Sequence, residues 1–474
     1  MSDDVPNVLA QRYASPAMVA VWSPRAKVIR ERRFWLAVLE AQRELGVEVP
    51  DGVVEDYEKV VDDVDLVSIE ARERVTRHDV KARIEEFCAL AGHEHIHKGM
   101  TSRDLTENVE QTQIRDGLAL IRDRMVAALA RLAERASEHA ELVIAARTHN
   151  VPAQATTLGR RFAGAGEELL LAFERLERLM ASYPLRGLKG PVGTSQDQLD
   201  LLDGDHERLE QLERTIARRL GFEAILIGPG QVYPRSLDLD VVSALVQATA
   251  GPASLATTIR LMAGHRLATE GFAPGQVGSS AMPHKVNTRS CERIGALAGV
   301  VRGHLTMVAS IAGAQWNEGD VSCSVVRRVA LPDAFFAVDG LLETFLHVLD
   351  GFAPHPAAVA AEVDRELPFL ATTKVLVAAV RAGSGREEAH RAIGEHALAS
   401  VRARQEGIEG DDLLDRLAGD PRIPLDRSQL GALVADPLTF VGAAGRQTAA
   451  FLARVAEVVA RHPQAADHRP GPLL

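Results

Sequence analysis

One long amphipathic stretch, from about Asp104 to Ala140, constrains the fold more than any other feature of the sequence. It contains no proline, and its apolar residues recur at the i, i+3, i+4 and i+7 spacing of an α-helix: Leu118, Ile121, Met125, Leu129, Leu132 and Ala136. Such a helix is far longer than the mean of ~11–12 residues in globular domains. The same pattern predicts four further long helices, over Leu158–Met180, Leu237–Thr269, Arg289–Ala314 and Pro332–Leu349.

Several helices of this length, with apolar residues on more than one face, are typical of a helical bundle. Aromatic residues make up only 4% of the chain, and strand patterns are short, near Leu226-Ile227 and Val232-Tyr233, where we expect small hairpins or loops. We therefore predict an all-α protein with an N-terminal helical region at 1–98, a central long-helix bundle at 99–350 and a C-terminal helical region at 351–474. The proline-rich tail from His462 is expected to be frayed.

Charge and cysteine content exclude several classes of protein. With 54 Lys and Arg against 65 Asp and Glu, the net charge is -11 at pH 7, which argues against a nucleic-acid binder. A cleft lined by a few basic residues still suits a small anion. The three cysteines form no CxxC pair, so no zinc ribbon is expected. We find no signal-peptide pattern and no run of ~18 apolar residues, and therefore expect a cytoplasmic protein with no membrane partner.

The segment Gly271–Asn287, GFAPGQVGSSAMPHKVN, is unlike everything around it. It holds three glycines and two prolines in a chain otherwise built of long helices. This composition favours a mobile loop or lid, which leads into a helix N-terminus where free N–H groups attract an anion. On composition alone, an ordinary solvated loop remains the simpler interpretation.

Two further segments carry residues with catalytic potential. Residues 145–152, AARTHNVP, place a lone His149 between predicted helices, where a structural histidine is the more common case. Residues 97–104, HKGMTSRD, contain Thr101 and Ser102, which suit the N-cap of the long helix. The nearby histidines at 93, 95 and 97 have no acidic partner at metal-ligand spacing, so we expect no metal site.

The glycine-rich segment Gly271–Asn287 matches the signature of the aspartase/fumarase superfamily, Gly-Ser-x-x-Met-x-x-Lys-x-Asn, over Gly278–Asn287. The resemblance implies an all-α homotetramer that eliminates fumarate from a succinyl group without a cofactor, at active sites shared between subunits. It implies Ser279 as the general base, with Ser280 as second choice and a binding residue. It also implies His149 as the general acid, with supporting roles for Lys285, Asn287 and Glu292; Glu292 is expected to orient His149.

Other motifs are similar to those of the adenylosuccinate lyase family: Gln11-Arg12-Tyr13, Arg77-His78-Asp79-Val80, Gln231 before Pro234-Arg235, and the stretch from Trp316 to Arg328. The resemblance covers roughly residues 11–335. It implies nucleotide substrates, adenylosuccinate and the succinylcarboxamide ribotide of purine synthesis. The implied substrate-binding residues are Arg12, Tyr13, Arg77, His78, Asp79, His97, Thr101, Ser102, Thr148, Gln231, Arg293, Ser324 and Arg328.

The sequence departs from the family pattern at Gly319, where an Arg that touches substrate is usual. That cationic contact is either missing or supplied from elsewhere, for example by Arg327. Two alternatives stay open at this point. One is another lyase of the superfamily, an argininosuccinate lyase or a carboxymuconate cycloisomerase, which has no use for a nucleotide phosphate site. The other is a non-catalytic helical scaffold that retains the fold.

Overall fold

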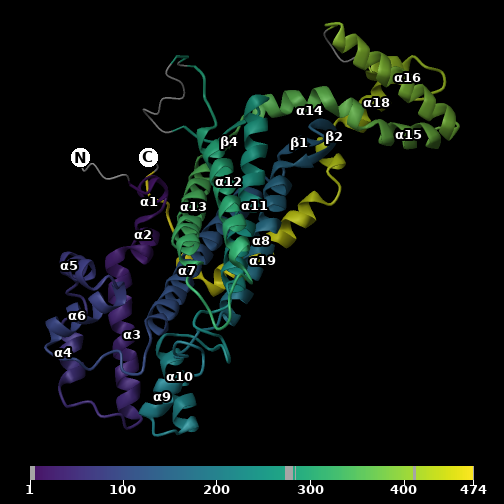
Figure 1. Ribbon diagram of the computed structural model, residues 1–474. Coiled ribbons are helices and arrows are strands. Elements are labelled where there is room, and N and C mark those ends of the chain that lie inside the picture. Colours follow the sequence, from purple (N-terminus) through teal and green to yellow (C-terminus); the bar gives the residue numbers. More distant parts are fainter. Residues whose placement is uncertain (1–5, 273–280, 283, 409–412, 473–474) are drawn as a thin grey trace.

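The computed structural model describes residues 6–272, 281–282, 284–408 and 413–472. Its centre is an elongated bundle in which α12 packs against α11 and α13, and α8 packs against α7 and α11 (Figure 1). The bundle helices are α7 (Ser102–Glu138), α8 (Leu158–Ser182), α11 (Ser236–Gly264), α12 (Arg289–Ile311) and α13 (Ser324–Gly351). The predicted all-α class and the five long helices are therefore confirmed.

Prolines do not mark the ends of these helices. Pro252 lies inside α11, and Pro332 lies inside α13, which begins eight residues earlier than the predicted start, at Ser324. A proline in a helix interior removes one intrahelical hydrogen bond. Burial offsets that loss, because α13 packs Leu331, Ala334 and Phe335 into the core. The predicted end of α11 at Thr269 is also wrong, since β3 (Ala268–Thr269) pairs there with β4 (Ala353–Pro354).

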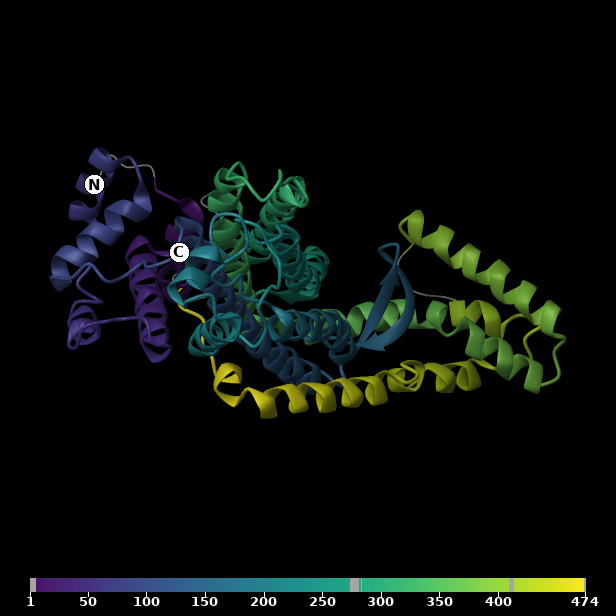
Figure 2. The same ribbon diagram turned by 60° about the horizontal axis from the view of Figure 1, so that its bottom comes forward.

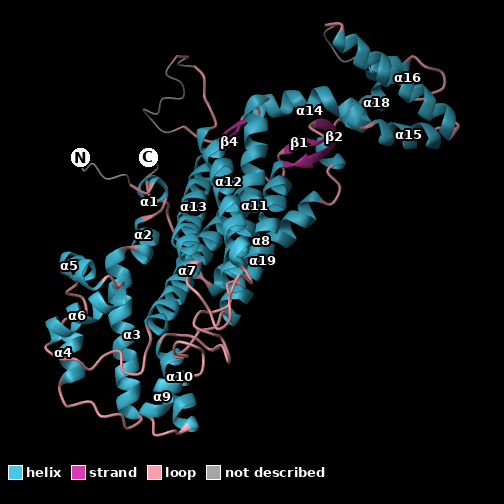
Figure 3. Cartoon of the chain, viewed as in Figure 1, coloured by secondary structure: helices cyan, strands magenta, loops and turns pink. Residues whose placement is uncertain are grey.

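A β-hairpin that the sequence reading missed joins α7 to α8, and Figure 3 shows it as a pair of strands at one end of the bundle. Strands β1 (Val143–Thr148) and β2 (Val151–Thr157) are antiparallel, with Thr148 opposite Val151. The turn consists of His149 and Asn150, whose φ angles are 52° and 61°. Both lie in the left-handed region that two-residue hairpin turns require. Near Leu226 and Val232 the chain forms loops, as one of our alternatives expected.

The N-terminal region packs against the end of the bundle where α7 begins, through contacts of α3 with α7 (Figure 1). Helix α10 also contacts α3, so the segment between α8 and α11 lies at this same end. The helices concerned are α1 (Val8–Arg12), α2 (Pro16–Trp22), α3 (Pro24–Glu44), α4 (Val53–Lys59), α5 (Leu66–Thr76), α6 (Asp79–Ala91), α9 (Gln196–Leu201) and α10 (His206–Arg219).

A second, smaller core lies at the far end of the molecule (Figure 2). It is formed by α15 (Thr372–Arg381), α16 (Arg386–Gln405), α17 (Leu413–Ala418) and α18 (Arg427–Val434). Helix α14 (Pro356–Leu370) leads from the bundle to this core, and the 3₁₀ turn Pro437–Phe440 follows it. From there α19 (Ala444–Arg461) runs back along α7 and α8, in yellow in Figure 2.

The tail after α19 is not frayed over the described residues, contrary to expectation. It forms the short helix α20 (Pro463–Ala466), which contacts α7. His468 Nε2 then lies 2.7 Å from a carboxylate oxygen of Glu343, and the Gly471 amide donates to the other oxygen at 3.1 Å. The end of the chain is thereby attached to the middle of α13.

Candidate active site

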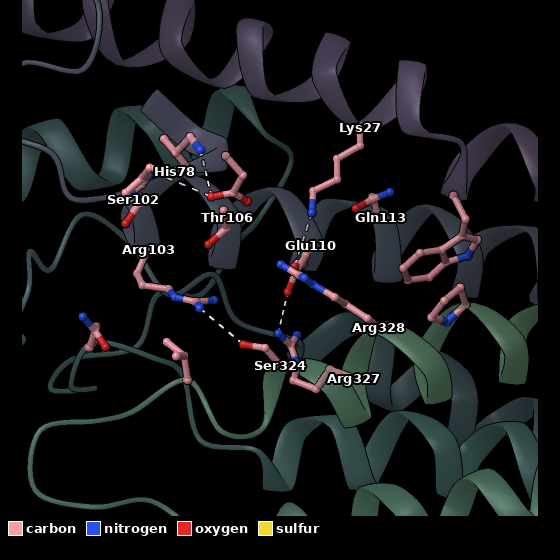
Figure 4. Close-up of a pocket in the computed structure, with 16 residues that line it drawn as sticks. Lys27, His78, Ser102, Arg103, Thr106, Glu110, Gln113, Ser324, Arg327 and Arg328 are labelled. Carbon is pink, nitrogen blue, oxygen red and sulfur yellow. Dashed lines mark hydrogen bonds and ion pairs between the residues drawn. The ribbon is translucent and has the colours of Figure 1, made fainter. Parts of the chain in front are cut away.

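A cleft of about 360 Å³ lies between the first turns of α6, α7 and α13, beside Lys27 of α3 (Figure 4). Six residues that were predicted from the sequence line it, although they come from four separate segments. They are His78, Asp79, Ser102, Gln231, Ser324 and Arg328. The structure thus brings together one part of the predicted substrate-binding residues.

The buried carboxylate of Asp104 organises one wall of the cleft. One oxygen accepts the Thr101 amide at 2.8 Å and completes a capping box at the start of α7. The other oxygen accepts Nη1 of the buried Arg186 at 2.6 Å and the amides of Lys189 and Gly190. Arg186 Nη2 also donates to the carbonyl of Gly230 at 3.1 Å. These bonds fix the loop that carries Gln231 against the beginning of α7.

A buried network of charges forms the floor and occupies Arg327 completely. Its Nε donates to Asp238 at 2.7 Å, its Nη1 to Glu110 and its Nη2 to the Tyr233 hydroxyl, while the side chain is only 4% exposed. Burial alone would favour a neutral Glu110, yet Arg327 and neighbouring cations lower the pKa of Glu110 to about 2. Each nitrogen of the Arg327 guanidinium is thus engaged within the chain, which argues against Arg327 as the replacement for the cation missing at Gly319.

Several lining residues were missed by sequence reasoning. Lys27 of α3 reaches into the cleft with Nζ 3.6 Å from Glu110, and Arg103 of α7 donates from Nη2 to the Ser324 hydroxyl at 3.3 Å. Gln113 and Trp22 also line the cleft. Arg103 follows Thr101-Ser102 directly, so its place in the first turn of α7 was the available signal.

His97, Thr101 and Arg77 lie in segments that border the cleft without lining it. His97 Nδ1 accepts the indole N–H of Trp35 at 3.0 Å, and burial lowers the pKa of His97 to about 4. His97 is thus neutral at pH 7. Arg77 caps the C-terminus of α5 with a φ of 51°, and His78 then caps α6, where its Nδ1 accepts the Lys81 amide.

A second group of predicted residues meets elsewhere along the bundle. Tyr13, which follows α1, packs against Gly340 of α13, and the guanidinium of Arg293 lies 5.4 Å from its ring centroid. Arg12 precedes Tyr13 at the last position of α1. None of the three lines the cleft. Within one chain, these three residues are therefore separate from the predicted residues that line the cleft.

The predicted acid lies at the opposite end of the bundle from the cleft. Thr148 and His149 are exposed at the tip of the hairpin beyond the C-terminus of α7. Since α7 has 37 residues, its ends are ~55 Å apart at 1.5 Å per residue. A non-glycine residue with a φ of 52° is uncommon outside turns and functional sites, so the hairpin holds His149 in a specific, projecting conformation.

The described end of the signature segment, residues 284–287, directly precedes α12 and does not line the cleft. Lys285 is exposed and Asn287 partly buried just before α12. Glu292, in the first turn of α12, lies 3.6 Å from Arg260 of α11, so within one chain its ionic partner is an arginine and not His149. Ser279 and Ser280 lie outside the described residues.

The described residues include no group of three or more His, Cys, Asp or Glu side chains arranged to hold a metal ion. In the histidine-rich segment, His93 Nε2 lies 2.8 Å from Asp56 and His97 pairs with Trp35. These histidines take part in ordinary structural hydrogen bonds.

Comparison with known proteins relates this chain to one group of enzymes. A family model described as lyase matches residues 14–303, and a model of the adenylosuccinate lyase C-terminus matches residues 368–451. The chain is 35% identical to adenylosuccinate lyase of Schistosoma mansoni, over 94% of each chain. It is 36% identical to the enzyme of Saccharomyces cerevisiae, over 95% of this chain and 94% of that one. The likeness thus extends beyond residue 335, the predicted end of the resemblance.

Solved structures of more distant proteins share the fold. A fumarate lyase from Mesorhizobium sp. BNC1 aligns with a TM-score of 0.79 at 23% identity, over 94% of this chain and 99% of that one. A 3-carboxy-cis,cis-muconate lactonizing enzyme from Pseudomonas putida aligns with a TM-score of 0.83 at 21% identity, over 95% and 99%. At these identities the likeness concerns architecture alone.

Proposed function

The chain belongs to the adenylosuccinate lyase family, and we propose that its catalytic residues meet only when several copies of it assemble. The activity is that of a fumarate-releasing carbon–nitrogen lyase, which cleaves adenylosuccinate to AMP and fumarate. The identity of 35–36% over nearly the whole chain carries this conclusion.

The proposed roles follow from the chemistry of the elimination. Abstracting a proton beside a carboxylate builds up negative charge that must be stabilised in the transition state. We assign proton abstraction to Ser279 in an activated, deprotonated form, because a free hydroxyl is too weak a base. Lys285 and Asn287 supply a positive charge and a hydrogen bond to the carboxylate. His149 protonates the departing nitrogen, for which an imidazole has a suitable pKa.

We propose a homotetramer with active sites shared between subunits. One chain keeps His149 and the cleft at opposite ends of a helix ~55 Å long, and this separation supports a site that is completed by other copies. Other copies must then bring His149 and the signature segment to the cleft. An antiparallel arrangement of bundles would do this, since it sets the two ends of α7 side by side.

The outer face of α12 supports such an assembly. Gly295, Gly299 and Gly303 recur every four residues on that face and are exposed, and a Cβ added to any of them would meet no atom within 4 Å. By length and composition alone, α11 and α12 are apolar enough to cross a membrane, a test that buried bundle helices also meet. Only 33% of the apolar window of α12 is buried within one chain. We propose that other copies cover the rest by close helix packing.

The proposal includes a second nucleotide substrate, the succinylcarboxamide ribotide, because the succinylamino group and the ribose phosphate are common to both substrates. It places the enzyme in the cytoplasm and needs no cofactor, nucleic acid or membrane. The muconate-type alternative has a likeness of fold alone, at 21% identity. The scaffold alternative is disfavoured because His149, Ser279 and Lys285 are all retained.

The test of this function is turnover by the purified enzyme, followed by absorbance, with adenylosuccinate, the succinylcarboxamide ribotide and argininosuccinate in parallel. We expect adenylosuccinate and the ribotide to be cleaved and argininosuccinate to be inert. Cleavage of argininosuccinate at a comparable rate, or no turnover of adenylosuccinate, would contradict the assignment.

A further inference from the structure

Three basic side chains from three different helices point into the cleft: Lys27 of α3, Arg103 of α7 and Arg328 of α13 (Figure 4). The carboxylates nearest to them are already engaged. Glu110 is bound by Arg327, and Glu107 by Arg235 at 2.9 Å, whereas Lys27 and Arg103 lie 3.6 Å and 3.4 Å from them. Charge-assisted hydrogen bonds are normally 2.7–2.9 Å long. The cleft therefore has positive charge available for a ligand.

The two bundle helices that begin at the cleft, α7 and α13, differ in which groups bind the free N–H groups of their first turns. Helix α7 has a capping box, and the carboxylate of Asp104 supplies the negative charge at its first turn. Helix α13 begins at Ser324 without a side-chain cap and without an acidic residue in its first turn. Free N–H groups and the helix dipole favour an anion at such an end. The anion is therefore expected at the start of α13 rather than at the start of α7.

Arg103 reaches that position from the opposite wall. Although it sits in the first turn of α7, its Nη2 donates to the Ser324 hydroxyl at 3.3 Å, across the cleft. Arg328 lies one turn further along α13 and lines the same space. An anion at the start of α13 thus meets guanidinium groups from two sides.

The loop before α13 offers no cation of its own. Residues 316–323, WNEGDVSC, include two acidic and no basic side chains. Gly319 has a φ of 134°, and a Cβ there would lie 3.1 Å from the Cβ of Gln231. Only glycine adopts this backbone conformation without strain. A side chain at position 319 is therefore excluded by the conformation of the loop.

We propose that Arg103 is a substrate-binding residue that holds the phosphate of the nucleotide at the N-terminus of α13, together with Arg328. A phosphate monoester carries close to two negative charges and accepts several charge-assisted hydrogen bonds, which suits two guanidinium groups beside free backbone amides. This inference rests on the proposed nucleotide substrate. It goes beyond it because it assigns the missing cationic contact to a residue in another helix.

The experiment compares phosphorylated and dephosphorylated ligands on the assembled enzyme. Wild type, Arg103→Met, Arg103→Lys and the surface control Arg122→Met are assayed with adenylosuccinate and with succinyladenosine, which lacks the phosphate. Arg122 is matched because it lies on the same helix and pairs only with its neighbour Asp123 among the described contacts. Binding of AMP and adenosine is measured by calorimetry on the same four proteins.

We expect Arg103→Met to lower kcat/KM for adenylosuccinate by about tenfold to a hundredfold, mainly through KM, and to weaken AMP binding by a similar factor. Succinyladenosine and adenosine should not distinguish Arg103→Met from wild type, and Arg103→Lys should recover part of the loss. Equal losses with and without the phosphate would overturn the inference, because Arg103 would then act on another part of the ligand or on the fold. If wild type fails to cleave adenylosuccinate, the proposed function fails separately, and the AMP and adenosine titrations still test Arg103.

Discussion

The buried pair Arg186–Asp104 should be the strongest single polar link between the cleft wall and the bundle, and Arg186→Met tests this. Both side chains are 0% exposed, and the pair is 2.6 Å long. Removing one partner of a buried ion pair costs about 3–5 kcal/mol, because the other charge is left buried and uncompensated. Asp104 keeps three backbone donors, from Thr101, Lys189 and Gly190. We therefore expect the lower part of that range, about 3 kcal/mol of unfolding free energy.

The assay is equilibrium urea unfolding followed by far-ultraviolet circular dichroism, at one protomer concentration for all variants, because association adds to apparent stability. Arg122→Met serves as the surface control and should change the free energy by less than about 1 kcal/mol. The double variant Asp104→Asn/Arg186→Met should be more stable than Arg186→Met alone, because no unpaired charge remains. If the unfolding free energy of Arg186→Met lies within about 1 kcal/mol of that of Arg122→Met, the reasoning is refuted.

Ser279→Ala and His149→Ala should each lower kcat by ~10²–10⁴ with substrate binding retained, since each removes a proton transfer; steady-state kinetics near wild type for either variant would reject its role. Arg12→Met and Arg328→Met should each raise KM for both purine substrates together, and unchanged KM values would remove them from the binding site. His97 has a pKa of about 4, below the ordinary 6.5, so its contribution to stability is present above pH 6.5 and is lost as the pH falls toward 4. Between pH 7 and pH 5, wild type should therefore lose about 2 kcal/mol more unfolding free energy than His97→Gln in urea titrations, and parallel pH profiles would contradict this.

The long helices could be predicted because their signal is local and repeated many times. Residues 118–136 place an apolar side chain toward the core at every turn of α7, so the helix is predicted even if one position is assigned wrongly. The start of α13 at Ser324 is not evident from the sequence, because a proline such as Pro332 usually indicates a helix boundary. Tertiary burial of the residues around it outweighs the hydrogen bond that the proline removes.

The hairpin that carries His149 was missed for a different physical reason. Two-residue hairpin turns are usually recognised by Asn-Gly or Asp-Gly, whereas this turn is His149-Asn150. The adjoining strands are rich in alanine and contain Pro152, which are weak strand signals. The order of the motifs identified the chemistry, but the sequence carries no local signal for which motifs share one cleft. That is decided by the bundle, which gathers His78, Ser102, Gln231 and Ser324 and leaves His149 ~55 Å away.

The central claim is that no single chain holds a complete active site, and subunit complementation tests it most directly. Ser279→Ala and His149→Ala proteins are each expected to be inactive or nearly so, and equal amounts are mixed, dissociated and reassembled. If the two groups in a site come from different chains, random assembly pairs wild-type segments in about one quarter of sites, so about a quarter of wild-type activity should return. Activity that stays at the level of the separate variants after verified reassembly would contradict the shared site and return both residues to one chain.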